Sequence, residues 1–412
     1  MSHNNNTGFL ESKSGFSSSN ISNKMKHGDT SKSYQLNKMT GTKYVAYNEN
    51  SQTKEEKEIN HGEDKINNSE KEKTTKESYH INYFYDSSKL YKNQEKIKGI
   101  FGFKNFKLSN NCFMNSSLQN LFHCKQFIQL MKSISEKKLE GKKLAFEIKR
   151  LIKQIDDGKD NLDPKTIKDI LGETIEKYRY NEQNDANEFI IIFLNQLLKE
   201  LYGIGKYDPG KIPIDKMELD AFDKLEKKFF IKNKCFLLNL FYGRLKKEYI
   251  CENGHLCLIK FNNFNTITLP LQKNSNTIEE LLNIYQGNKK IEDKIFCNKC
   301  QKECKYSIKT KIYNIPNYFI LCLENENLYY SPEIIYQNIL ETKNFMDSNN
   351  KKYYLTSLVS YSGNKKAGHY IAKVFQDMEW YLINDSLYWK INKSEILDKY
   401  SKILFYTIED LY

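Results

Sequence analysis

The sequence predicts an α+β domain that follows a long polar segment. Apolar residues recur at helical spacing between residues 112 and 201, whereas runs rich in β-branched and aromatic residues, broken at glycine and proline, dominate from about residue 235. Helices first and strands later are typical of an α+β fold with an antiparallel sheet, not of a parallel α/β sheet.

Residues 1–95 are expected to be a disordered polar segment. They are rich in Ser, Asn, Lys, Glu and Thr, with charges nearly balanced and neither Cys nor Trp. Such a composition cannot bury enough apolar surface to offset its conformational entropy; a small folded domain is the alternative. Residues 96–412 are expected to form the folded domain, with both tryptophans and all nine cysteines.

Charge and hydropathy argue against two classes of partner. The formal net charge is +12, but the lysines are scattered among Asn and Glu, so we expect no nucleic-acid partner. No apolar run reaches spanning length and no apolar leader opens the chain, so we expect no membrane partner. An odd number of cysteines without a leader favours reduced thiols and an intracellular location, in cytoplasm or nucleus.

The first helix is predicted to begin at Cys112. Apolar residues recur behind it at helical spacing, so one face should pack into a core, and the polar run at 109–111 suits an N-cap. A thiol at that position feels the positive end of the helix macrodipole, which favours thiolate. Cys112 is therefore a candidate nucleophile.

Three further helices are expected. A charged helix spans residues 137–155, and Asp163-Pro164 opens another because proline is tolerated in a first helical turn. Asp185 with Glu188 resembles a capping box before an apolar helix that runs to about residue 201. A surface excursion through Gly203 and Pro209-Gly210 follows.

The strands are expected mainly in the second half. The runs lie at 245–257, 264–271, 306–313, 318–323, 368–374 and 380–386. If the last two form a symmetric hairpin with its turn centred on Gln376-Asp377, His369 lies directly opposite Asn384. Cross-strand Cβ atoms are about 4.5–5.5 Å apart, so the Asn384 amide can orient the imidazole. Cys112 as nucleophile, His369 as base and Asn384 or Asp385 as orienter would form a thiol-protease triad.

The remaining cysteines include a metal-site pattern. Cys297 and Cys300 form a knuckle in which both sulfurs can reach one tetrahedral zinc. The first pair of zinc ligands is less regular, since either His255 or Cys257 could join Cys251 to complete the site. Four protein ligands would make the zinc structural; hairpin tips that bind no metal are the alternative.

These motifs together resemble the ubiquitin-specific protease family, a branch of the papain-like cysteine proteases. The nucleophile box is met at 110–119, the Gln-x-Asp-Ala-x-Glu-Phe box at 183–189, and Phe-x-Gly-x-Leu at 241–245. Gly-His-Tyr-x-Ala is met at 368–372 and Asn-Asp-Ser at 384–386. The matches extend from about Gly99 to Tyr412.

The resemblance implies a papain-like fold with a thumb, a palm and zinc-braced fingers. It implies a deubiquitinating thiol protease, a monomer, that hydrolyses the isopeptide or peptide bond after the C-terminal glycine of ubiquitin, with no cofactor in catalysis. The oxyanion-hole asparagine maps to Asn105, with Asn110 in reserve because Lys107-Leu108 look inserted. Asp185 would meet the basic tail of ubiquitin.

Two departures from the family pattern adjoin the expected ubiquitin surface. Leu323-Glu324-Asn325-Glu326 replaces Leu-Lys-Arg-Phe, and Tyr361 stands where a histidine is frequent. Two alternatives therefore remain: a protease for another ubiquitin-like modifier, and a catalytically weak or inactive ubiquitin-binding scaffold.

Overall fold

The structure is a computed structural model. It describes residues 97–106, 109–203, 211–212, 235–271, 277–324, 336–347, 350–363 and 367–408. All of these belong to the second of the chain's two units, residues 68–412. The segment expected to be disordered, 1–95, and the residues expected to be inserted, Lys107 and Leu108, lie outside the described residues. Most of the expected surface excursion, at residues 204–210, lies outside them as well.

The N-terminal half of the described unit is helical, as predicted. Its helices are α2 (Cys112–Phe122), α3 (Lys125–Ser133), α4 (Glu136–Leu139), α5 (Lys143–Asp156), α6 (Lys165–Gly172) and α7 (Ala186–Tyr202). The single helix expected at 137–155 is instead the pair α4 and α5. It breaks at Gly141, whose φ of 72° is a left-handed conformation that a helix interior does not contain. Two later helices are α9 (Phe236–Phe241) and α10 (Ile278–Tyr285).

An eight-stranded sheet carries the C-terminal part of the chain. Its strands follow the order β12-β11-β10-β9-β13-β7-β4, with β8 paired to β9. They span β4 (Ile267–Pro270), β7 (Tyr318–Glu324), β8 (Ile339–Glu341), β9 (Lys352–Gly363), β10 (Gly368–Gln376), β11 (Glu379–Asn384), β12 (Leu387–Ile391) and β13 (Ser401–Ile408). All pairs are antiparallel except β4 with β7. The predicted α+β class is confirmed.

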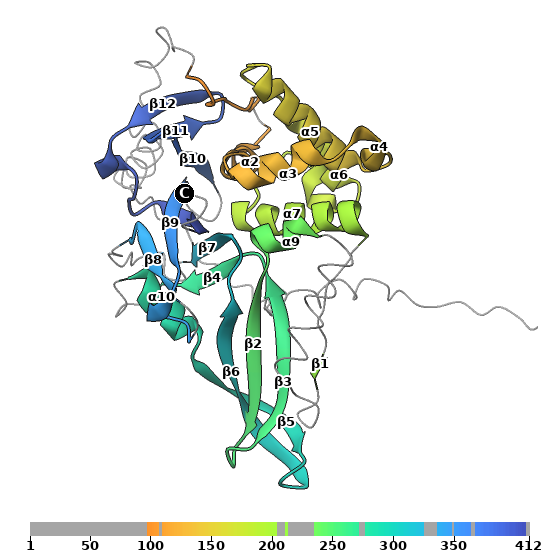
Figure 1. Cartoon of the computed structure of the whole chain (residues 1–412), viewed down its shortest axis with the longest axis vertical. Helices are drawn as coiled ribbons and strands as arrows, with labels where there is room; N and C mark the ends of the chain where they lie inside the picture. Colours follow the sequence, from red (N-terminus) through yellow and green to blue (C-terminus); the bar gives the residue numbers. More distant parts are fainter. Residues whose placement is uncertain are drawn as a thin grey trace, which may run out of the picture. The chain divides into compact units, whose positions relative to one another are not determined.

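A second, five-stranded sheet extends away from the first (Figure 1). Its order is β1-β3-β2-β6-β5, and its strands are β1 (Lys211–Ile212), β2 (Gly243–Cys251), β3 (Leu256–Phe264), β5 (Asn288–Cys297) and β6 (Lys302–Asn314). The single run predicted at 245–257 is wrong. It is the hairpin of β2 and β3, because Gly254 at a φ of 79° turns the chain.

The predicted register of the β10–β11 hairpin is also wrong. Gln376 pairs with Glu379, so the turn is Asp377-Met378 and not Gln376-Asp377. Both turn residues have positive φ, 49° and 67°, as a two-residue hairpin turn of the primed type requires. Neither residue is the glycine or asparagine that usually marks such a turn, so its position could not be predicted from the local sequence.

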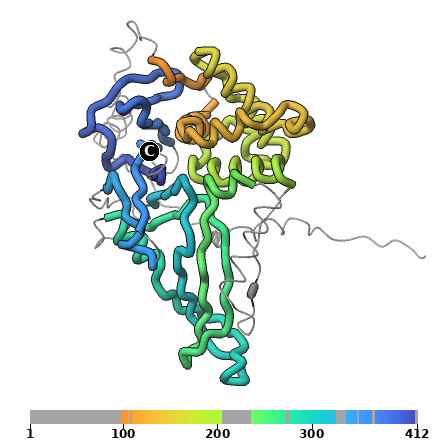
Figure 2. The backbone as a smooth tube through the Cα atoms, in the orientation of Figure 1, coloured from red at the N-terminus to blue at the C-terminus, as the bar shows by residue number. Residues whose placement is uncertain are grey.

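The helices and the large sheet share one hydrophobic core. Helix α2 contacts β10, β9 and α7, although more than 200 residues separate it from the strands. Figure 2 shows this: the orange early helix lies against the blue late strands. None of the helices in the described part of the chain is both long and apolar enough to span a membrane.

Candidate active site and metal centre

Helix α2 places Cys112 at its first position. All eleven residues of α2 are buried, so the expected single buried face is wrong. Its polar side chains bond to the elements around it: Gln119 Nε2 donates to Phe101 O at 2.8 Å, and Asn120 Nδ2 donates to Leu358 O at 3.3 Å. These bonds explain how polar residues tolerate a central position.

Strand β10 brings His369 close to Cys112. The His369 ring interacts with the Cys112 side chain, which raises the pKa of the ring, and its Nε2 lies 2.6 Å from Asn384 Oδ1. Because Nε2 faces the amide, Nδ1 is left for the thiol. Asn384 reaches the ring although the β10–β11 ladder is described only from Ala372 onward. Of the three residues expected to form a triad, His369 thus interacts with both of the others.

The electrostatics at His369 favour its protonated form. Burial opposes the charge, but the hydrogen bond and charge of Cys112, the charge of Asp385 and the hydrogen bond of Asn384 outweigh burial and raise the pKa of His369 to about 9. At neutral pH the imidazole is therefore cationic beside the sulfur. An imidazolium beside a thiol is the arrangement that activates a cysteine nucleophile.

Asp385 joins three parts of the site. Its Oδ2 accepts from Asn105 Nδ2 at 2.9 Å and its Oδ1 accepts from Asn115 Nδ2 at 2.8 Å. Its backbone oxygen accepts from Phe103 N at 2.8 Å, and its Oδ2 lies 3.9 Å from His369 Nε2. Asp385 therefore holds the segment before α2 against the strand that carries the orienting amide. Asn115 is a partner of Asp385 that no sequence motif predicted.

The two oxyanion candidates lie in different surroundings. Asn105 Oδ1 accepts from Asn111 N at 3.2 Å, while one N–H of its Nδ2 is directed at Asp385. Asn110 Nδ2 donates instead to Asn181 O at 2.8 Å. Only Asn105 thus belongs to the network that contains Asp385 and Asn115.

Asp185 begins α7 and faces a basic partner from its own chain. Its side chain accepts from Glu188 N at 3.0 Å, as predicted for a helix cap. Its Oδ2 also accepts from Lys402 Nζ at 3.0 Å and from Tyr370 Oη at 3.3 Å. Burial raises the pKa of Asp185, but Lys402 and the backbone hydrogen bonds outweigh burial and hold the pKa below its usual value.

Gln183 links the start of α7 to β10, the strand that carries His369. Its Nε2 donates to Gly368 O at 2.9 Å, and Gly368 N donates back to its Oε1 at 3.0 Å. A Cβ on residue 368 would lie 2.2 Å from Tyr361 Oη, so any residue larger than glycine would require the tyrosine ring to move. Gln183 and Asp185 therefore lie beside His369.

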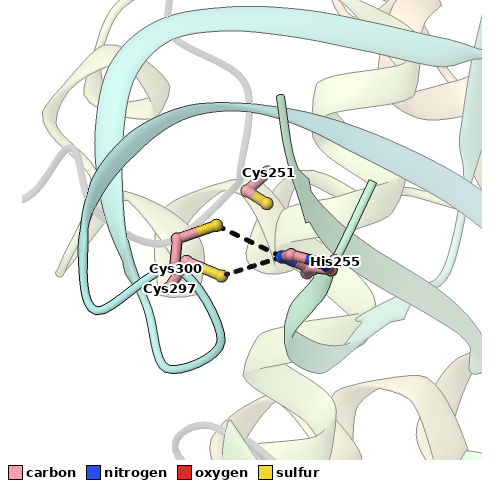
Figure 3. A group of neighbouring side chains, drawn as sticks. All are labelled: Cys251, His255, Cys297 and Cys300. Atoms are coloured by element: carbon pink, nitrogen blue, oxygen red, sulfur yellow. Dashed lines mark hydrogen bonds between the residues drawn. The ribbon is translucent and has the colours of Figure 1, made fainter. Parts of the chain in front are cut away.

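Four side chains at the far end of the five-stranded sheet form a candidate metal centre. One ligand atom each from Cys251, His255, Cys297 and Cys300 lies within 4.8 Å of the others. His255 Nδ1 lies 3.2 Å from Cys300 Sγ and 3.7 Å from Cys297 Sγ, and all four residues converge on one point (Figure 3). Around tetrahedral zinc, such nitrogen and sulfur ligands would be about 3.6 Å apart. The donors and their spacing therefore fit a metal ion.

The turn geometry explains why histidine belongs to this group. Gly254 N donates to Cys251 O at 2.8 Å, and Cys251 N donates to His255 O at 2.9 Å, which closes a tight turn. The group of four, among the residues that the structure describes, does not include Cys257, whose thiol donates to His255 O at 3.4 Å. Of the two completions left open by the sequence, the structure brings His255 into the group.

The comparisons with known proteins agree on one family. A family model described as ubiquitin carboxyl-terminal hydrolase matches residues 101–406. The chain is 22% identical to the rat protein "Ubiquitin carboxyl-terminal hydrolase 2" over 342 residues, which is 77% of this chain and 55% of that protein. It is 24% identical to the cattle protein of that name over 343 residues, 77% of this chain and 56% of that protein. The chain thus spans about half the length of these relatives.

Solved structures show the same fold. A SAGA DUB module bound to monoubiquitin contains a chain that aligns with a TM-score of 0.59 and 20% identity. The alignment covers 81% of this chain and 75% of that one. At this identity the likeness establishes the fold alone.

Proposed function

The chain belongs to the ubiquitin carboxyl-terminal hydrolase family, and from that premise we propose that it is a deubiquitinating thiol protease. Its substrate would be the isopeptide or peptide bond after the C-terminal glycine of ubiquitin. The observation that carries the proposal is the position of His369, whose ring interacts with Cys112 and whose Nε2 lies 2.6 Å from Asn384 Oδ1. An inactive scaffold would have no need for this alignment.

In the first half-reaction, the Cys112 thiolate attacks the glycine carbonyl carbon. Negative charge develops on the carbonyl oxygen, where the backbone N–H of Cys112 and the second N–H of the Asn105 amide stabilise it. The His369 imidazolium then gives its proton to the departing amine. Asn384 holds the ring in the orientation that this transfer needs.

In the second half-reaction, His369 changes from acid to base. Formation of the thioester removes the negative charge of the Cys112 sulfur, which is one cause of the raised pKa of His369. The pKa of the ring therefore falls, and the neutral imidazole can take a proton from the water that hydrolyses the thioester.

The metal centre is proposed to hold a structural zinc ion through Cys251, His255, Cys297 and Cys300. Zinc bound by four protein ligands has no open position for water, so it would brace the end of the sheet and take no part in catalysis. It would fix β2–β3 against β5–β6, because Cys251 and His255 flank the first turn and Cys297 and Cys300 the second.

We expect the protein to act on ubiquitin and ubiquitinated proteins as a monomer inside the cell. All nine cysteines are free thiols, and both the nucleophile and the metal ligands require that state. A related modifier is the second candidate substrate, favoured by the Lys402–Asp185 pair at the place where a basic tail is expected.

The test is reaction of the full-length protein with ubiquitin that carries a C-terminal electrophile. A covalent adduct that is lost in Cys112→Ala supports both ubiquitin recognition and an activated thiol. An adduct that persists in Cys112→Ala, or no adduct from folded protein that does bind ubiquitin, would contradict the proposal. Parallel probes built on ubiquitin-like modifiers separate the second candidate.

A further inference from the structure

Lys168 of α6 is a buried lysine that points at the loop before the nucleophile. Its residue is 5% exposed. Its Nζ lies 3.0 Å from Asn111 Oδ1, 3.2 Å from Asn181 Oδ1 and 3.3 Å from Ser109 O. An ammonium has three N–H groups, so these three oxygens can satisfy all of them.

The absence of an acidic partner sets this lysine apart. Lys373 is buried to a similar degree but pairs with the Asp398 carboxylate at 2.7 Å. Within the part of the chain that the structure describes, no carboxylate lies in ion-pair distance of Lys168 Nζ. Burial lowers the pKa of Lys168, and the charge of Asp169 opposes that shift only in part. Burying a charge without a counter-charge is costly. A contribution to stability alone therefore does not explain why a lysine occupies position 168.

The position of the three acceptors indicates what the charge does. Ser109 and Asn111 flank Asn110, which adopts a left-handed φ of 51°, and Cys112 follows directly. Asn181 belongs to the segment that leads to α7, and its backbone oxygen accepts from Asn110 Nδ2 at 2.8 Å. One ammonium therefore ties the loop before the nucleophile to the segment that carries Gln183 and Asp185.

We propose that Lys168 is a positioning residue for Cys112. It holds the loop that sets the start of α2, and it adds fixed positive charge at the helix end where the thiolate forms. Both effects stabilise the attacking state of the sulfur. This inference rests on the proposed thiol-protease function, since it assigns Lys168 a part in activating that nucleophile.

The test compares four variants of the full chain. Lys168→Met removes the charge and the donors, Lys168→Gln keeps donors without the charge, and Lys168→Arg keeps both. Lys165→Met is the matched control, because Lys165 lies one turn earlier on the same helix, exposed and paired with Asp169. The readouts are the pH profile of Cys112 alkylation by iodoacetamide, and kcat and KM on a fluorogenic ubiquitin substrate.

We expect alkylation at pH 7 and kcat to fall by about tenfold in Lys168→Met and Lys168→Gln, with the alkylation profile moved to higher pH. KM should stay within about twofold, Lys168→Arg should recover part of the loss, and Lys165→Met should match the wild type. A merely structural role would lower the melting temperature without moving the alkylation profile.

Two results would overturn the proposal: folded Lys168→Gln with a wild-type alkylation profile, or an equal loss in Lys165→Met. If Lys168→Met does not fold, Lys168→Gln and Lys168→Arg decide the matter. Alkylation requires no ubiquitin, so failure of this inference is distinguishable from failure of the proposed function.

Discussion

Lys402 Nζ lies 3.0 Å from Asp185 Oδ2, so the carboxylate at the start of α7 is already paired within the chain. The ammonium also lies 5.2 Å from the ring centre of Tyr361 and 5.8 Å from that of Tyr370. A basic substrate tail that meets Asp185 must therefore displace Lys402 or share the carboxylate with it.

This pair predicts how the protein responds to the charge of the tail. Lys402→Gln should free Asp185 and raise kcat/KM on ubiquitin about three- to fivefold, the amount that a partly exposed ion pair is worth. This gain in kcat/KM should vanish on a ubiquitin substrate in which the arginines of the C-terminal tail are changed to alanine. Steady-state kinetics on the matched substrates measure this. An equal gain on both tails would contradict it.

Asn384 is predicted to act through the orientation of His369. Asn384→Ala removes the 2.6 Å contact to His369 Nε2, so kcat should fall by about 100-fold while KM changes little. Stopped-flow acylation and steady-state rates check this. A variant that keeps wild-type kcat would show that Asp385, 3.9 Å from the same nitrogen, is the orienting group instead.

The raised pKa of His369 predicts the alkaline limit of activity. The imidazolium donates a proton to the leaving amine, so the acylation rate should fall as pH rises through about 9, where His369 loses that proton. In Cys112→Ala the partner sulfur is gone, and the pKa of His369 should drop. NMR titration of the His369 ring in both proteins gives the values. An unchanged pKa in Cys112→Ala would exclude the sulfur as its cause.

Metal content is predicted to depend on the group of four. The purified protein should contain about one zinc per chain, and Cys300→Ser or His255→Ala should lower that content. Cys257→Ser is the control, since its thiol lies outside the group. Hydrogen exchange in β2–β3 and β5–β6 should rise with metal loss, because binding free energy contributes to folding. Folded wild-type protein without metal would refute the zinc proposal.

Gly102 is predicted to be intolerant of any side chain. A Cβ there would lie 2.6 Å from Ser386 O and 2.7 Å from Ser386 Cα, which is backbone and cannot swing away. Gly102→Ala should cost about 1–3 kcal/mol of unfolding free energy and lower kcat by displacing Asp385. Chemical denaturation compares it with Gly172→Ala, where the nearest atoms lie at 3.4 Å. Equal stability of the two variants would contradict this packing argument.

The sequence predicted the secondary structure that carries the site residues better than it predicted their register. Cys112 begins a helix and His369 lies on a strand, because local periodicity and residue preference determine both. The hairpin register was wrong by one turn residue, since Asp377-Met378 adopts left-handed φ without glycine. His369 still reaches Asn384, because the observed register leaves them two residues from direct opposition on the same face of the sheet, where diagonal neighbours remain within reach.

The roles of the two lysines, Lys168 and Lys402, could not be predicted from local sequence patterns. Lys168 meets Asn111 across 57 residues, and Lys402 meets Asp185 across 217. Each is one lysine among many in a basic chain, and nothing nearby in sequence distinguishes it. The burial of α2 on all sides could not be predicted from the sequence either, because its polar residues have hydrogen-bond partners in distant segments.

The bond between Asn105 and Asp385 spans 280 residues of chain. Contacts of such long sequence separation are the costliest in loop-closure entropy and form late in folding. A chain still leaving the ribosome would hold Cys112 and Asn105 without His369 and without Asp385, the residue that binds the Asn105 amide. On the proposed mechanism, the thiol would gain its reactivity only when almost the whole domain has assembled, and incomplete copies would be inert toward other proteins.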